Sequence, residues 1–303
     1  MAFTAKDVQA LREKTGCGMM DCKKALTECD GNMEAAVDFL REKGLASQAK
    51  KAERVAAEGT VTTYVGDGAA AIVEVNTETD FVASNELFKK CAAEIAEIAA
   101  KQNPSTVEDL LTKKNDAGQT VEEMIQEIFL QFRENMKVRR FMRFEGDVVT
   151  YVHAGGKIGV MVKFDTDVAD KDGFAEMGKN VAMQIAAMNP LYLDEAAVPA
   201  EVLAKEKEIL VAQMKEDPKM ANKPEQVLAK IVEGKIGKYY KENCLVDQQF
   251  VVDGEFTVGK YVENVAKQLG GNIKISEYVR FEKGEGIQKR EDNFADEIAN
   301  MIK

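Results

Sequence analysis

The stretch that decides the fold is Ala71–Asn85, which reads AIVEVNTETDFVASN. Its first six residues have the character of a strand, and a helix-like run follows at 86–100. Phe81, next to Asp80, therefore falls in a turn between a strand and a helix, and such loops often carry functional side chains. The ring either packs back into the core, which is the commoner position for a large apolar side chain, or it faces a partner.

An internal repeat surrounds this stretch. A shift of 87 residues places Gly59 on Gly146 and aligns 58–100 with 145–187 without a gap. Each copy reads strand, glycine turn, strand, loop and Ala-rich helix, which predicts an α+β core of two similar subdomains with antiparallel sheets. The second copy has Asp167-Val168 where the first has Asp80-Phe81. The second copy lacks the aromatic ring, so the shared fold does not require it. The sequence therefore supports a partner-facing Phe81 as much as a Phe81 packed in the core.

The segment before the repeat predicts a compact module of three helices over 1–44. Thr4 is placed to cap the first helix and Gly16 to end it, and Gly44 is expected to end the third. The Ala- and Lys-rich run at 45–57 carries no turn signal, so we expect a helical linker there.

The remainder of the chain predicts further helices and one strand. Apolar residues at helical spacing predict a helix over 120–138, and two more periodic helices predict an antiparallel hairpin, a short coiled coil, inserted at 199–243. A helix at 257–269, a strand at 272–282 and a final helix at 293–302 follow. The predicted domains are the module at 1–44, the linker at 45–57, a core N-subdomain at 58–140, a core C-subdomain at 141–198 and 244–285, the hairpin at 199–243, and a C-terminal module at 286–303.

Composition excludes several classes of function. The net charge is −11 with acids and bases interspersed, which argues against broad nucleic-acid binding. The single histidine rules out a multi-His metal site, and Ile158 after Gly155-Gly156-Lys157 breaks the phosphate-loop pattern. The five cysteines form no C-x-x-C pair, which is typical of reduced thiols in the cytoplasm, and no apolar run predicts a membrane span. We therefore expect protein binding in the cytoplasm, with no cofactor, metal, nucleic acid, membrane or small-molecule substrate.

Four motifs are distributed, in order and spacing, over essentially the whole chain. They are Leu11–Leu26 (LREKTGCGMMDCKKAL), Glu74–Asn85, Tyr151–His153 with Gly156–Val160, and Arg280–Glu282 with Gly284–Ile287. Together they resemble the elongation factor Ts family, the bacterial exchange factors for the GTPase elongation factor Tu. The chain departs from the family at Gln249, where the family usually has a proline, and this puts the local backbone geometry in question.

The resemblance implies both a function and a set of contacts. It implies a guanine-nucleotide exchange factor rather than an enzyme, one that promotes GDP release so that GTP can bind, as a heterodimer or 2:2 assembly with elongation factor Tu. The three-helix module would have a UBA-like fold and dock on the GTPase domain of Tu. Asp80 and Phe81 would insert near its magnesium site, and His153 would face its third domain. The implied partner-binding residues are Leu11, Met19, Met20, Lys23, Thr79, Asp80, Phe81, Val82, Phe132, His153, Val251 and Val252.

Two other functions stay open at this point. An adaptor of the same fold could bind elongation factor Tu without driving exchange. A small-molecule enzyme is the weakest alternative, because the chain carries no visible constellation of acid–base or nucleophilic residues. Release of labelled GDP from elongation factor Tu discriminates the first alternative, and a pocket with converging polar groups would be needed for the second.

Overall fold

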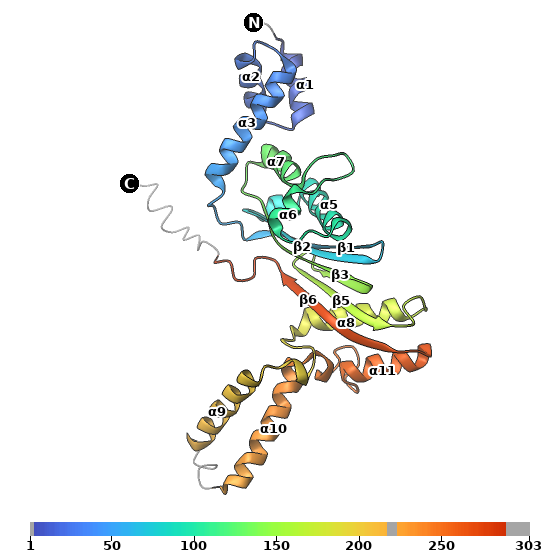
Figure 1. The fold of residues 1–303 in the computed structure, drawn as a ribbon. Coiled ribbons are helices and arrows are strands. Elements are labelled where there is room, and N and C mark those ends of the chain that lie inside the picture. Colours follow the sequence, from blue (N-terminus) through green and yellow to red (C-terminus); the bar gives the residue numbers. More distant parts are fainter. Residues whose placement is uncertain (1–2, 217–222, 289–303) are drawn as a thin grey trace. The chain divides into compact units, whose positions relative to one another are not determined.

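A computed structural model describes residues 3–216 and 223–288 of the 303-residue chain (Figure 1). The fold is α+β, as the sequence predicts, and its sheets are antiparallel. The chain divides into two compact units. Among the described residues, the first comprises 3–143, 152–159 and 281–288, and the second comprises 144–151, 160–216 and 223–280. The domain limits expected from the sequence stay predictions, and the helix expected at 293–302 lies outside the described residues.

Three helices open the first unit: α1 (Ala5–Thr15), α2 (Met19–Glu28) and α3 (Met33–Lys51). As predicted, α1 follows Thr4 and ends at Gly16, which takes the left-handed conformation with φ 67°. The predicted end of the third helix at Gly44 is wrong, because α3 continues to Lys51. A Cβ at Gly44 would collide with Leu130, so this glycine permits close packing between helices instead of ending one. The linker expected at 45–57 is accordingly helical only as far as Lys51.

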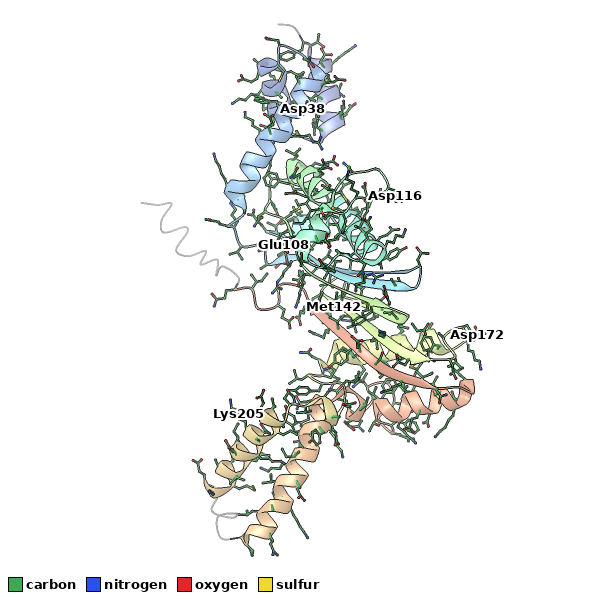
Figure 2. All side chains as sticks on the ribbon, in the orientation of Figure 1. Asp38, Glu108, Asp116, Met142, Asp172 and Lys205 are labelled. Atoms are coloured by element: carbon green, nitrogen blue, oxygen red, sulfur yellow. The ribbon has the colours of Figure 1, made fainter. Side chains whose placement is uncertain are left out.

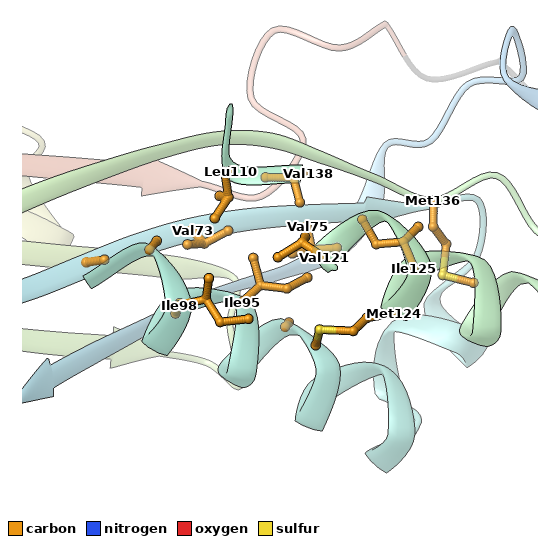
Figure 3. Close-up of a cluster of buried hydrophobic side chains, with 14 of the residues drawn as sticks. Val73, Val75, Ile95, Ile98, Leu110, Val121, Met124, Ile125, Met136 and Val138 are labelled. Atoms are coloured by element: carbon orange, nitrogen blue, oxygen red, sulfur yellow. The ribbon is translucent and has the colours of Figure 1, made fainter. Parts of the chain in front are cut away.

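The first sheet has the order β1 (Glu58–Gly66), β2 (Ala69–Thr77) and β3 (Lys137–Glu145). The strands β1 and β2 pair antiparallel from Glu58 opposite Thr77 to Gly66 opposite Ala69. Three helices accompany the sheet: α5 (Glu86–Gln102), α6 (Val107–Thr112) and α7 (Val121–Phe132). Figure 3 shows the apolar core that β2, β3, α5, α6 and α7 share, with labelled side chains from each.

Two features of this region differ from the sequence-based expectation. The helix predicted over 120–138 ends at Phe132, and β3, which was not predicted, begins at Lys137. The cause is Arg133, which takes the left-handed conformation with φ 58° while its N–H donates to the carbonyl of Phe129 at 2.8 Å. A non-glycine residue rarely adopts this conformation, so the sequence contains no signal for it.

The second sheet has the order β4 (Asp147–His153), β5 (Ile158–Thr166) and β6 (Ile273–Glu282). The helix α8 (Phe174–Met188) follows β5 in the chain, and α11 (Val258–Leu269) precedes β6. The elements β4, β5 and α8 repeat the order of β1, β2 and α5, which confirms the predicted repeat.

The predicted helical hairpin is also present. Its helices are α9 (Ala200–Glu216) and α10 (Glu225–Asn243), which pack through the buried side chains of Leu210, Met214, Val232 and Ile236. Short 3-10 helices lie on either side, η1 (Glu195–Ala197) and η2 (Leu245–Asp247). Figure 2 shows the charged side chains of both units, and Asp38, Glu108, Asp172 and Lys205 among them are exposed.

Candidate functional site

The loop after β2 contains a short helix, α4 (Asp80–Ser84). Thr79 caps it by accepting a hydrogen bond from the Val82 N–H at 3.4 Å. The side chains of Val82 and Ala83 face the core, while Phe81 is 85% exposed. The structure therefore excludes the core-plug alternative for Phe81 and leaves its ring in solvent.

The equivalent loop of the second copy behaves differently. Val168 occupies the place of Phe81 and is only 2% exposed. Its neighbour Asp167 accepts a hydrogen bond from the Asn272 N–H at 2.7 Å, and this bond holds the pKa of Asp167 below its ordinary value. The apolar side chain at this position is thus buried in the second copy and exposed in the first.

A carboxylate distant in the sequence braces the loop that carries Phe81. Glu134 accepts hydrogen bonds from the Thr77 hydroxyl at 2.9 Å, from the Thr79 N–H at 3.0 Å and from the Thr79 hydroxyl at 2.7 Å. Thr77 is fully buried, and Glu134 is partly buried. No local sequence pattern links Glu134 to its partners, because they lie more than fifty residues earlier in the chain.

The residue after Glu134 adds a second brace. The Asn135 N–H donates to Glu78 Oε1 at 2.6 Å, and its buried side-chain amide donates to the carbonyls of Ala52 at 3.1 Å and Arg54 at 2.7 Å. Residues 133–135 therefore connect the end of α7 to the turn before α4 and to the segment that follows α3.

The N-terminal module presents a second group of predicted contact residues. Met19 and Met20 begin α2 and are 44% and 74% exposed, and Lys23 is exposed one turn later. Leu11, in contrast, lies fully buried in the core of the module. We therefore assign Leu11 to the support of this surface, and the same holds for the buried Val82 beside Phe81. Asp21 of α2 accepts a hydrogen bond from Arg133 at 2.9 Å, so the module is tied to the loop after α7.

The other predicted contact residues are divided between the units. Phe132 is half-buried and packs against the core of the first sheet, which gives it a structural contact. His153 is exposed at the end of β4, where its carbonyl accepts from the Gly156 N–H at 3.2 Å. Val251 and Val252 are exposed in the second unit.

The loop that carries Val251 and Val252 is held by glutamines. Gln184, fully buried on α8, accepts from the Val251 N–H at 2.8 Å and donates to the Gln249 carbonyl at 3.2 Å. The Gln249 side chain donates to the Gly254 carbonyl at 2.6 Å and closes the loop. This bond answers the question raised by the absent proline, since the side chain of Gln249 itself restrains the backbone.

Residues 3–216 and 223–288 contain no cluster of three histidine, cysteine or acidic side chains that could hold a metal ion. Over the same residues, no helix has the length and apolar character that a bilayer crossing requires. The site thus consists of exposed apolar side chains held on hydrogen-bonded supports, within an α+β fold that contains an internal repeat.

Comparison with known proteins assigns this fold to a family. The family model described as Elongation factor TS matches residues 78–285. The protein named Elongation factor Ts from Clostridium perfringens (strain SM101 / Type A) is 53% identical, over 99% of this chain and 99% of its own length. The protein of the same name from Clostridium botulinum (strain ATCC 19397 / Type A) is 49% identical, over 99% of this chain and 98% of its own. The chain belongs to the elongation factor Ts family.

Proposed function

We propose that the chain is a guanine-nucleotide exchange factor that binds elongation factor Tu in its GDP-bound form. It disturbs the Mg²⁺ and phosphate site of Tu and promotes GDP release, so that GTP binds and translation elongation continues in the cytoplasm. It acts by binding and catalyses no covalent step. The active assembly is a heterodimer with Tu or a 2:2 complex, which mass measurement in solution distinguishes.

The observation that carries this proposal is the exposure of Phe81 on a braced loop. An aromatic ring that is 85% exposed has most of its surface available for burial by a partner. Burying such a side chain is worth about 1.5–3 kcal/mol, which corresponds to roughly a tenfold to hundredfold effect. Phe81 alone is therefore insufficient, and we assign the rest of the binding energy to Met19 and Met20 of the N-terminal module and to Val251 and Val252.

Insertion of this ring offers a physical route to GDP release. GDP and Mg²⁺ in a GTPase are held by backbone amides and by the charge of the ion, which is often the largest in such a site. A side chain wedged beside them, with Asp80 next to it, shifts the groups that position the ion and the phosphates. The coupling is reciprocal: if the chain weakens GDP binding by some factor, GDP weakens binding of the chain by the same factor.

Release of a fluorescent GDP analogue from elongation factor Tu tests the proposal. The intact chain should accelerate release, and Phe81→Ala should lower the accelerated rate about tenfold to hundredfold. Val65→Ala is the matched control, because Val65 is 53% exposed on β1 of the same unit and lies outside the proposed contact set. An intact chain that binds Tu without accelerating release would be an adaptor, and the proposal would fail.

A further inference from the structure

We propose that Glu134 is the positioning residue of the loop that carries Phe81. It holds the turn before α4 in its binding geometry before any partner arrives. This inference rests on the proposed function, and it adds a residue that lies outside the four motifs. It follows from three observations: the donors that converge on Glu134, the backbone conformation before it, and the shortness of α4.

The chemistry at Glu134 requires an acceptor with several lone pairs. Three donors from two residues, Thr77 and Thr79, point to its two oxygens at 2.7–3.0 Å. An ionised carboxylate is an acceptor only, and its two oxygens together accept about four hydrogen bonds. One of the three donors is the backbone N–H of Thr79, the residue that caps α4. The carboxylate thus orients the cap from which the helix starts.

The backbone before Glu134 is held in a conformation that costs energy. Arg133 is a non-glycine residue with φ 58°, in the left-handed region. Its side chain bonds Asp21, and its carbonyl accepts from the Lys51 ammonium, so two helices of the N-terminal module maintain the turn. Backbone strain of this kind tends to lie at functional sites, where surrounding contacts support it. Here the turn at Arg133 places the Glu134 carboxylate against the loop after β2.

The helix that carries Phe81 needs such support. α4 has only five residues, which is far below the length at which a helix is stable by itself in water. Asp80, Phe81 and Ser84 are exposed, so only Val82 and Ala83 anchor it by packing. A loop held in its binding geometry loses less conformational freedom when the partner binds, and affinity rises accordingly.

The first test measures loop order without elongation factor Tu. Chymotrypsin cleaves after aromatic residues, and the fragment that ends at Phe81 can be quantified by mass spectrometry. Glu134→Ala should raise the rate of this cleavage about tenfold. The matched control is Glu123→Ala, which removes a carboxylate from the other end of α7, where it accepts from the Thr120 N–H at 2.9 Å. Cleavage after Phe81 should be unchanged in this control.

The second test measures coupling to exchange. Glu134→Ala should slow stimulated GDP release about tenfold in the intact chain and have little further effect in a Phe81→Ala background, because Glu134 acts through the ring. A general loss of folding would lower the rate by the same factor in both backgrounds. Thr77→Val removes one donor and keeps the carboxylate, so it should change both readouts in the same direction by a smaller factor. It also replaces Glu134→Ala if that variant does not fold.

The outcomes separate this inference from the proposed function. Faster cleavage after Phe81 in Glu134→Ala than in Glu123→Ala, together with non-additive loss of exchange, supports the positioning role. Equal cleavage in the two variants, or an equal exchange loss with and without Phe81, overturns it. If the intact chain does not accelerate GDP release at all, the proposed function fails and the cleavage comparison alone decides the role of Glu134.

Discussion

Replacement of Glu74 by glutamine should strongly destabilise the first unit. Glu74 lies on β2, four residues before the brace at Glu78, and its side chain is fully buried. It accepts from Arg139 at 3.1 Å, from Arg140 at 2.6 Å, from the Asn76 side chain at 3.1 Å and from the Gly284 N–H at 2.7 Å. The carboxylate thereby connects β2, β3 and the segment after β6.

The size of the effect follows from this environment. Removing one partner of a buried ion pair costs about 3–5 kcal/mol, because the other charge is left uncompensated. The side chains of Arg139 and Arg140 retain 25% and 29% exposure, and both also donate to Glu285. We therefore take the lower end and expect Glu74→Gln to lower the free energy of unfolding by about 3 kcal/mol at pH 7.

The pH dependence has a definite sign. Burial raises the pKa of Glu74, but the Gly284 N–H, Asn76 and the two arginines lower it by more, so it lies below its ordinary value. A carboxyl group with a lowered pKa stabilises the fold fully above its unfolded pKa, about 4.3, and loses this contribution as the pH falls through the folded pKa. The difference between Glu74→Gln and the natural chain should therefore be largest at neutral pH and narrow below about pH 4.

Urea unfolding followed by circular dichroism measures the effect, since urea, unlike guanidinium, leaves ion pairs unscreened. Glu285→Gln is the control, because Glu285 bonds the same Arg140 at 3.1 Å but is 47% exposed. An exposed pair is worth about 0–1 kcal/mol, so this variant should unfold close to the natural chain. A Glu74→Gln variant that unfolds together with the control at pH 7, or a difference that does not narrow in acid, would refute the reasoning.

Two further predictions concern burial. Val168→Ala should lower the free energy of unfolding by about 1–3 kcal/mol, because this side chain is buried. Phe81→Ala should change the free energy of unfolding by less than about 0.5 kcal/mol, because its ring is exposed. Equal urea midpoints for the two variants would contradict the difference in burial between the two loops. Burial, aided by the charges of Glu94 and Glu127, raises the pKa of Cys91 to about 12, so at pH 8 iodoacetamide should alkylate it about a thousandfold more slowly than an ordinary thiol. Unfolding in urea should restore fast labelling, and rapid labelling of the half-buried Cys91 in the native chain would contradict its raised pKa.

Most secondary-structure elements could be predicted from the sequence because their signals are local. The hairpin helices α9 and α10 lie within a few residues of the predicted limits. The helix α11 begins directly after its cap Thr257 and ends at Gly270, as its periodicity indicates. The repeat likewise predicts the order of strands and helix in both copies. A cap or an apolar period depends on residues within one or two turns of each other, so the sequence contains all that is needed.

The errors arose where a distant contact overrode a local signal. Gly44 has the usual character of a helix end, yet α3 passes through it because the missing side chain makes room for Leu130 of another helix. The residues after Phe132 are compatible with a helix, but the backbone of Arg133 adopts the left-handed conformation. Next to this turn, the Arg133 side chain donates to Asp21, and Glu134 accepts from the Thr79 hydroxyl. Neither outcome is encoded within the segment itself, since tertiary contacts routinely outweigh intrinsic helix propensity.

The sequence by itself determined the fold class, the repeat and the family to which the chain belongs, because these are properties of order and spacing along the chain. Only the tertiary structure decided that Phe81 faces solvent while Val168, at the same place in the repeat, is buried. Only the tertiary structure, likewise, brought Glu134 to the loop before α4. The physical reason is the same in both cases: exposure and long-range hydrogen bonding depend on which surfaces the folded chain brings together, and spacing along the sequence does not specify that.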